Sequence, residues 1–263
     1  IGAIPDQDPE VLNRLYPDLA AHLSDELGVE VEYIPVTDYA ASVSAFRIGD
    51  LDAVWFGGLT GVQARAKVSG AHAIAQGIED PEYFSYFVAH KDSGIEPSDD
   101  FPMGLAGKQF TFGSRSSTSG RLMPEHFIRK FTGKSPEEFF GHPDTFSDAH
   151  DRTAKNVESG AADAGALSYK TYDKMLANKE LDPELCRVVW KTPFYADYIV
   201  TAHPDLETMF GAGFTDRLKK AILAYADKDV LDNGFQRAKF IEAKDEDFAA
   251  IKELAKQLGQ LDG

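Results

Sequence analysis

The sequence has few of the residues that catalytic and metal-binding proteins need. Its single cysteine, Cys186, excludes an internal disulfide and a thiolate metal site. The histidines form no His-Glu-x-x-His motif, and no Walker or dinucleotide-binding glycine motif follows a predicted strand. There is no Gly-x-Ser-x-Gly motif, and the Ser, His and Asp residues fit the order of no catalytic triad. We therefore expect a protein that is not an enzyme and that has neither a metal nor another cofactor.

Basic residues are also scarce. The chain of 263 residues has 27 Lys and Arg against 43 Asp and Glu, a net charge of −16. Because nucleic acids are bound through clustered Lys and Arg, this balance argues against nucleic acid as a partner. The same negative charge opposes the long-range attraction of an anion, so any anion site has to be local and preorganised.

Long hydrophobic runs are absent. No apolar run approaches the roughly 20 residues that a membrane-spanning helix requires. The chain begins at Ile1 in a strand-like segment, with no basic and apolar leader before it. A secreted chain after removal of its signal peptide has this form, and so has a trimmed or a cytosolic chain.

The chain does contain a regular alternation of strand and helix patterns. The first series predicts helices and strands in turn, at 9–27 (helix, closed by Gly28), 29–35 (strand), 38–48 (helix), 51–58 (strand) and 60–68 (helix). A second series predicts strands at 108–112, 163–167 and 187–190, and helices at 148–159 and 169–177.

Two extended segments, 83–89 and 198–202, flank the second series. Strands that alternate with helices favour an α/β protein whose sheets are mainly parallel and covered by helices. We expect two lobes, with residues 1–88 and 200–263 in lobe 1 and residues 89–199 in lobe 2. The two extended segments would connect them as a hinge, and ligand sites tend to lie at domain interfaces.

The most distinctive stretch is 113–124, which carries four consecutive hydroxyl residues, Ser116, Ser117, Thr118 and Ser119. It lies between a predicted strand and a predicted helix that Gly133 ends, with Pro124 tolerated in the first turn. Free amides and the helix dipole at such a start, together with the hydroxyls, form a receptacle for a small anion. The alternative is an ordinary helix N-cap, but a cap needs only one hydroxyl.

Other candidate ligand-binding residues have a structural alternative each. His150 begins a predicted helix and could equally be a structural histidine. Trp55 and Phe56 end a strand before two glycines, a position that often faces the ligand in α/β sheets, although aromatic residues there also pack in cores. The phenols of Tyr39 and Tyr83 could contact a ligand or pack, and Asp197 places a carboxylate at the second extended segment.

These residues resemble a known family over nearly the whole chain. The pattern is similar to that of periplasmic solute-binding proteins of the phosphonate/phosphite ABC-transporter type, some branches of which are assigned to other oxyanions such as selenate. The segments that carry the resemblance are Asp38-Tyr39, Asp52 to Gly58, Tyr83-Phe84-Ser85, Ser116 to Gly120 with Pro124, His150-Asp151, Asp163 to Ala166, and Thr192 to Asp197.

The resemblance implies a two-lobed, hinge-closing receptor of the type II binding-protein fold. It implies that Ser117, Thr118 and Ser119 grip the oxygens of the anion, that Tyr39 and Tyr83 close over it, and that His150 and Asp197 complete the site. A periplasmic monomer that serves a membrane permease is expected. Aminoalkylphosphonate receptors carry a further acid for the amine, whereas the residues after Ala166 here are Leu167-Ser168-Tyr169-Lys170.

Asp197 bears on the identity of the anion. A carboxylate repels an oxyanion unless the ligand has a proton to donate, and phosphite, phosphonates and hydrogen phosphate can carry a P–OH near neutral pH, whereas selenate and sulfate cannot. We therefore expect phosphite or a small phosphonate. The alternatives are selenate, sulfate, phosphate or an arsenic oxyanion, a sensory receptor that signals to a membrane histidine kinase, or a hydrolase or transferase that uses the hydroxyl stretch as a phosphate cradle.

Overall fold

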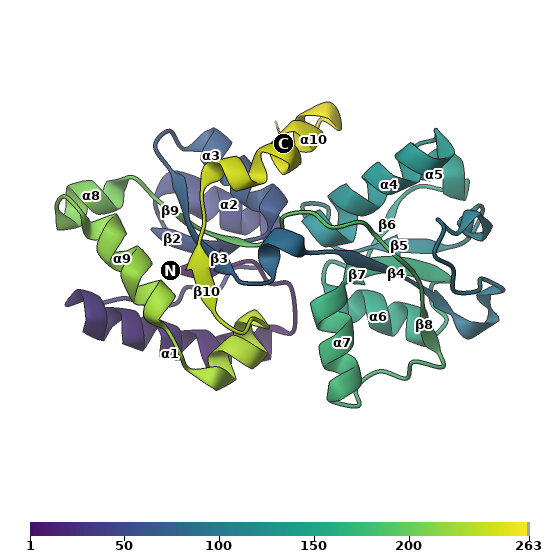
Figure 1. Cartoon of the computed structure of the whole chain (residues 1–263), viewed down its shortest axis with the longest axis horizontal. Coiled ribbons are helices and arrows are strands. Elements are labelled where there is room, and N and C mark those ends of the chain that lie inside the picture. The colour runs from purple at the N-terminus through teal and green to yellow at the C-terminus, as the bar shows by residue number, and fades with distance from the viewer. Residues whose placement is uncertain (262–263) are drawn as a thin grey trace. The chain divides into compact units, whose positions relative to one another are not determined.

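The computed structural model describes residues 1–261. They form two compact units, each with its own sheet (Figure 1): unit 1 comprises residues 1–83 and the chain from Tyr195 onward, and unit 2 comprises residues 84–194. Residues 84–88, which were expected in lobe 1, therefore belong to unit 2, and residues 195–199, which were expected in lobe 2, belong to unit 1. The first of these segments enters strand β4 (Ser85–His90) of the unit 2 sheet and the second enters strand β9 (Ile199–Ala202) of the unit 1 sheet, where their backbone groups are paired.

The sheet of unit 1 is mixed and mostly antiparallel, so the expectation of mainly parallel sheets is wrong here, because the chain that returns from unit 2 enters the sheet in the opposite direction. Strands β1 and β2 pair in parallel, β9 lies between β2 and β3 and runs antiparallel to both, and β10 runs antiparallel to β3. Strands β1, β2 and β3 thus share one direction, and β9 and β10 run opposite to them. The order of strands in this sheet is β1 (Gly2–Ala3), β2 (Ala53–Phe56), β9, β3 (His72–Gly77) and β10 (Phe240–Glu242).

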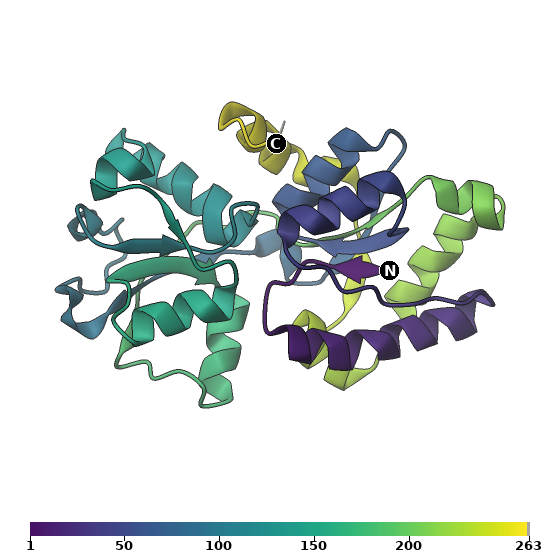
Figure 2. The same cartoon turned by 180° about the vertical axis from the view of Figure 1, so that it is seen from behind.

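Helices cover both faces of this sheet. Helices α1 and α9 lie on one face and α2, α3 and α10 on the other (Figures 1 and 2). Helix α1 buries Leu12, Leu15, Leu19 and Leu23 and ends at Gly28, as its periodicity predicts. The α-helices of unit 1 are α1 (Pro9–Leu27), α2 (Tyr39–Ile48), α3 (Gly58–Lys67), α8 (Asp205–Phe210), α9 (Phe214–Ala224) and α10 (Ala249–Gln257).

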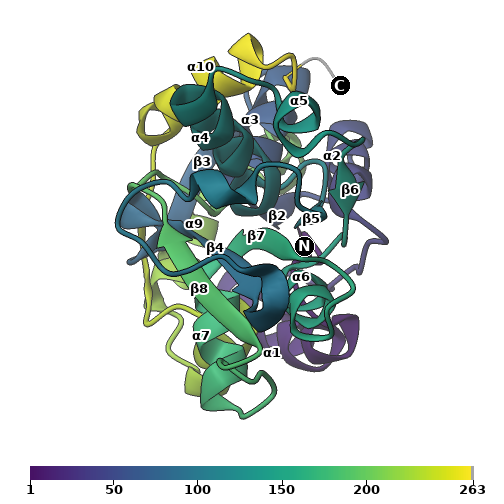
Figure 3. The same cartoon turned by 90° about the vertical axis from the view of Figure 1, so that its right-hand side faces the viewer.

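The sheet of unit 2, seen in Figure 3, has the order β6-β5-β7-β4-β8. Strand β5 pairs in parallel with β6 and β7, and β4 runs antiparallel to β7 and β8. Its other strands are β5 (Phe110–Phe112), β6 (Thr145–Phe146), β7 (Ala164–Ser168) and β8 (Cys186–Lys191), and its α-helices are α4 (Met123–Thr132), α5 (Pro136–Phe140), α6 (His150–Glu158) and α7 (Tyr169–Ala177). Of the helices in residues 1–261, none is long and apolar enough to cross a bilayer.

One predicted strand is wrong. Residues 29–35 have the alternation of a strand, but the structure assigns them no strand. None of their side chains is buried, so the alternation has no core to face. Their bonds are isolated ones and form no ladder: the Val31 amide donates to the Ser24 hydroxyl at 2.9 Å, and the Ile34 amide donates to the Ile1 carbonyl at 2.9 Å.

Candidate functional site

The hydroxyl-rich stretch lies in unit 2 between β5 and α4. Thr118–Leu122 form a π-helical segment that continues into α4 at Met123, where the sequence predicted an α-helical start. Such wide turns are rare and occur frequently at functional sites. Ser117, Thr118 and Ser119 are each only 1% exposed, and Ser116 is half-buried.

Ser117 is the N-cap of this segment. Its Oγ accepts a hydrogen bond from the Gly120 amide at 2.9 Å, the capping role that the sequence left open. That role accounts for one hydroxyl of the four. Thr118 and Ser119 occupy the first turn itself, where the amides and the helix dipole favour negative charge. Their burial at this position fits an anion site better than a cap alone.

Glycines allow this stretch to pack against α6. The amide of Gly113 donates to the Gly120 carbonyl at 2.9 Å. A Cβ on Gly120 would lie 3.0 Å from the Gly113 Cα and 3.2 Å from the His150 Cε1, closer than real Cβ atoms ordinarily come. Gly120 therefore lets the hydroxyl stretch lie directly beside His150, the first residue of α6.

His150 is buried and neutral. Its Nδ1 accepts a hydrogen bond from the Ser168 amide at 3.3 Å, so the ring proton resides on Nε2. Nε2 lies 3.4 Å from the Ser119 Oγ and donates to it, which leaves the Ser119 proton available for another acceptor. Burial lowers the pKa of His150 to about 3. His150 and Ser119 thus form a neutral chain of hydrogen-bond donors that ends at the Ser119 hydroxyl. The Ser85 hydroxyl donates to the Ser119 carbonyl at 2.7 Å and so holds the backbone of this serine.

This arrangement differs from a catalytic Ser-His pair. A general base must accept the serine proton, whereas His150 donates to Ser119 and its pKa is far below neutral pH. Nδ1 is occupied by a main-chain amide and not by an orienting carboxylate. The geometry supports binding and gives no support to a hydrolase. Within residues 1–261, no group of three or more His, Cys, Asp or Glu residues is placed to hold a metal ion.

The buried state of His150 predicts a pH dependence of stability. The unfolded chain binds a proton on this histidine below its ordinary pKa of about 6.5, whereas the folded chain does not until about pH 3. The contribution of His150 to the free energy of unfolding should therefore fall by up to about 1.4 kcal/mol per pH unit as the pH decreases through this window.

Urea unfolding of the protein and of a His150→Gln variant, at about pH 7 and about pH 5, measures this effect. Glutamine does not titrate, so the protein should lose stability relative to the variant at the lower pH. A difference between the two that stays constant with pH would show that His150 titrates normally in the folded chain.

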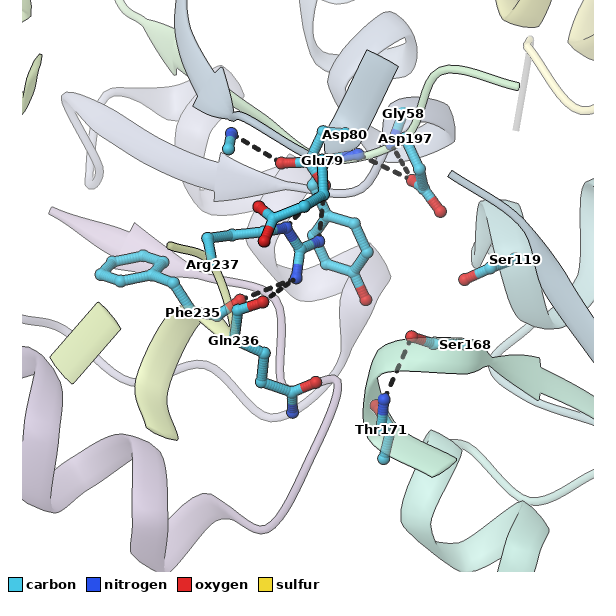
Figure 4. Close-up of polar contacts among 12 residues, drawn as sticks. Gly58, Glu79, Asp80, Ser119, Ser168, Thr171, Asp197, Phe235, Gln236 and Arg237 are labelled. Carbon is cyan, nitrogen blue, oxygen red and sulfur yellow. Dashed lines mark hydrogen bonds and ion pairs between the residues drawn. The ribbon is translucent and has the colours of Figure 1, made fainter. Parts of the chain in front are cut away.

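Asp197 lies in unit 1, just before β9, and is 1% exposed. Its Oδ1 accepts hydrogen bonds from the Gly58 amide at 2.8 Å, as Figure 4 shows, and from the Tyr198 amide at 2.9 Å. Gly58 is the first residue of α3, so the carboxylate sits at the positive end of that helix. These bonds fix the orientation of Asp197, whatever ligand it contacts.

The tyrosines predicted from the sequence are also buried in unit 1. Tyr39 begins α2, and Tyr83 pairs with Tyr195 in an isolated β-bridge. The structure adds Tyr198 to them. Its ring centroid lies 5.3 Å from that of Tyr83, and its pKa is raised mainly by burial and also by the charges of Asp6, Tyr83, Tyr39 and Asp197. The side chains of these residues therefore converge, and we name Tyr39, Tyr83 and Tyr198 the phenol cluster.

Tyr198 was missed from the sequence. Its φ is +46°, a left-handed conformation that is rare for tyrosine and is typical of functional positions. Its ring stacks on Trp55, with ring centroids 5.4 Å apart. The only signal in the sequence was its position next to Asp197.

Trp55 and Phe56 have different roles. Trp55, through its contact with Tyr198, lies beside the phenol cluster. Phe56 is fully buried and packs edge-to-face on Phe46 of α2, with ring centroids 5.6 Å apart. Adjacent residues of a strand point to opposite faces. Core packing therefore explains Phe56, and only Trp55 remains beside the candidate site.

Comparison with known proteins agrees with this chemistry. A family model described as "ABC transporter, phosphonate, periplasmic substrate-binding protein" matches residues 1–248. A probable ABC transporter phosphite binding protein, PhnD1 of Prochlorococcus marinus, is 41% identical over 268 residues, which cover 99% of this chain and 90% of the relative. The structure of PhnD1 from that organism in complex with methylphosphonate is 42% identical, with a TM-score of 0.92 over 98% of this chain and 97% of that one.

A more distant structure confirms the fold class. A binding protein component of an ABC phosphonate transporter from Pseudomonas aeruginosa matches with a TM-score of 0.83 at 20% identity, over 99% of this chain and 86% of that one. The predicted α/β binding-protein fold and the predicted family are both confirmed. The chain belongs to the family of periplasmic substrate-binding proteins of phosphonate ABC transporters.

Proposed function

We propose that the protein captures phosphite or a small phosphonate in the periplasm and delivers it to the membrane permease of an ABC importer. The observation that carries the proposal is the buried start of the π-helical segment, where Thr118 and Ser119 are both buried and Ser119 contacts a neutral His150. The candidate ligand-binding residues are Ser116, Ser117, Thr118, Ser119 and His150 in unit 2, and Tyr39, Tyr83, Trp55 and Asp197 in unit 1.

Hydrogen bonds alone suffice for such a ligand. A hydrogen bond to a charged group contributes roughly 1.5–3 kcal/mol, and micromolar affinity requires about 8 kcal/mol. Five or six bonds of middling strength contribute about 11–14 kcal/mol, which leaves a few kcal/mol to offset ordering and desolvation. The proposal therefore needs no arginine in contact with the anion.

A protonated phosphorus oxyanion is favoured among the candidate ligands. The buried carboxylate of Asp197 would accept a hydrogen bond from a P–OH group and would repel a fully ionised selenate or sulfate. The name of the 41% identical relative and the methylphosphonate in the 42% identical structure favour the same ligand class.

An amine-bearing phosphonate is disfavoured. In unit 2, the rings of Phe84 and Tyr169 stack with centroids 3.8 Å apart, next to Ser168. The Lys191 Nζ lies 3.7 Å from the Phe84 ring centroid, and the Lys170 Nζ lies 5.5 Å from that of Tyr169. Both lysines interact with the carboxylate of Asp173, so the acid near this stack is already balanced by two cations and would hold a ligand ammonium group weakly.

A thermal-shift screen tests the proposal. Phosphite and methylphosphonate at about 100 times their Kd should stabilise the protein by about 2.7 kcal/mol and raise its Tm, whereas selenate and sulfate should raise it less. Hinge closure, which the family resemblance implies, would also reduce the radius of gyration measured by small-angle scattering. A larger shift with selenate or sulfate than with phosphite would overturn the proposed ligand.

A sensory receptor that binds the same ligand and signals to a histidine kinase remains the second candidate. Both functions use the same ligand-bound form, so the partner distinguishes them and the site does not. Binding of the ligand-loaded protein to a reconstituted permease, with stimulation of its ATPase, would support import.

A further inference from the structure

A buried ion pair lies beneath the phenol cluster in unit 1. The Arg237 Nε is 2.7 Å and its Nη2 is 2.6 Å from the Asp80 Oδ1, as Figure 4 shows in part. The two side chains are 2% and 0% exposed, respectively. The Arg237 Nη1 donates to the carbonyls of Phe235 and Gln236 at 2.8 and 3.1 Å. These polar contacts, all within unit 1, fix the position of the guanidinium.

Its remaining surface faces aromatic rings. The Arg237 Cζ lies 4.6 Å from the ring centroid of Tyr198, 5.0 Å from that of Tyr83 and 5.7 Å from that of Trp55. These distances are within the range of cation–π attraction, which is stronger where water is excluded. A cation against a phenol ring also withdraws negative charge from it and makes its O–H a better hydrogen-bond donor.

The pair is also connected to Asp197. The Asp80 Oδ2 accepts from the Gly77 amide at 2.6 Å, and the Asp80 carbonyl accepts from the Asp197 amide at 3.0 Å. A Cβ on Gly77 would overlap the Arg237 side chain, so glycine is needed for the pair to form. The turn that Arg237 holds therefore also holds the backbone of Asp197.

Stability alone explains this pair poorly. Desolvation of two buried charges consumes most of their attraction, and apolar replacements of such pairs are often neutral or stabilising. Unit 1 contains a second pair for comparison, in which the Arg65 Nε lies 3.1 Å from the Asp245 Oδ1 and the guanidinium lies 5.5 Å from the Phe248 ring. Only the Arg237 pair adjoins the phenol cluster.

We propose that Arg237 is a positioning residue for oxyanion binding: without touching the ligand, it holds Tyr83 and Tyr198 in place and strengthens their hydroxyls as donors. This inference rests on the proposed function and extends it, since neither the hydroxyl stretch nor Asp197 accounts for a buried cation at this place. It assigns to one arginine a role in affinity at a distance from the anion.

A double-mutant cycle tests the proposal. The variant Arg237→Met/Asp80→Asn removes both charges and keeps the volume, and it should weaken methylphosphonate binding about tenfold by calorimetry. If Arg237 acts through the phenols, the same change in a Tyr83→Phe/Tyr198→Phe background should cost less than about twofold. In a Thr118→Val background, Arg237→Met/Asp80→Asn should still weaken binding by the full factor of about ten.

Two further variants separate positioning from folding. Arg65→Met/Asp245→Asn removes the second arginine pair of unit 1, in which the arginine is 9% and the aspartate 48% exposed, and should leave affinity unchanged. Arg237→Lys keeps a cation beneath the rings and should restore affinity to within about threefold of the unchanged protein. Arg237→Lys remains informative if Arg237→Met/Asp80→Asn does not fold, because the stability of the lysine variant and its affinity for methylphosphonate can be measured separately.

The outcomes distinguish this inference from the proposed function. If the unchanged protein binds neither phosphite nor methylphosphonate, the proposed function fails. If it binds them but the Arg237 variants bind equally well, or lose the same factor with and without the two phenol hydroxyls, the positioning role is overturned and the proposed function stands.

Discussion

Thr118→Val is expected to weaken phosphite binding by about 100-fold while leaving the Tm of the ligand-free protein within a few degrees. Valine keeps the volume and branching of threonine, so the first turn of the π-helical segment should still form. It removes a hydroxyl at a position that is 1% exposed, and a charged oxygen left without that donor is costly in a site with little water. Isothermal titration calorimetry and thermal unfolding of the same preparation measure the two effects.

A matched control is available on the same helix. Thr132 ends α4, and its hydroxyl bonds the Ile128 carbonyl at 2.6 Å, far along the chain from the hydroxyl stretch. Thr132→Val makes the same chemical change and should leave affinity unchanged. Binding that survives Thr118→Val would remove the hydroxyl stretch from the proposed site, and a loss in both variants would point to a general effect on unit 2.

Asp197→Asn is expected to change the choice of ligand. The asparagine Oδ1 can still accept from the Gly58 and Tyr198 amides, so the fold around α3 is kept. Its amide nitrogen donates where the carboxylate accepted, so it no longer receives a P–OH proton and no longer repels a fully ionised anion. The ratio of phosphite to selenate affinity should fall by roughly 100-fold.

Calorimetric titration of the unchanged protein and of Asp197→Asn, each with phosphite and with selenate, measures this ratio. Asp163→Asn is the matched control, because the Asp163 Oδ2 also accepts from a main-chain amide, that of Gln109 at 2.9 Å, in unit 2. The control should keep the ratio of the unchanged protein. A preference for phosphite that is the same in Asp197→Asn would mean that this carboxylate does not select the protonated ligand.

Elements with strong local signals were predicted well. Helix α1 follows from its apolar periodicity and ends at Gly28, and α2 begins after the Asp38 cap and ends at Gly49, because propensity, capping and left-handed glycine act within a few residues. The prediction of a strand at 29–35 was wrong because a strand depends on more than its neighbours in the chain. Alternation is a local property, but a strand needs a partner and a buried face, which only the assembled sheet can supply.

The candidate site shows the same division. The run from Ser116 to Ser119 was visible in the sequence because four hydroxyls before a helix exceed what capping requires. The neutral tautomer of His150 depends on the Ser168 amide, which lies in another strand and far along the chain. Tyr198 has no local signal beyond its position next to Asp197, and Arg237 is an ordinary basic residue in the sequence until folding pairs it with Asp80.

The sequence by itself determined the α/β class, the two-unit division to within a few residues, the hydroxyl stretch at a helix start and, through family resemblance, the kind of ligand. The tertiary structure alone decided which strand each crossing segment joins, which hydroxyl is used up as a cap, which way the His150 proton points and which cation lies beneath the phenols. The physical reason is that helix periodicity and capping depend on neighbours in the chain, whereas protonation, desolvation and strand pairing depend on groups that only folding brings together.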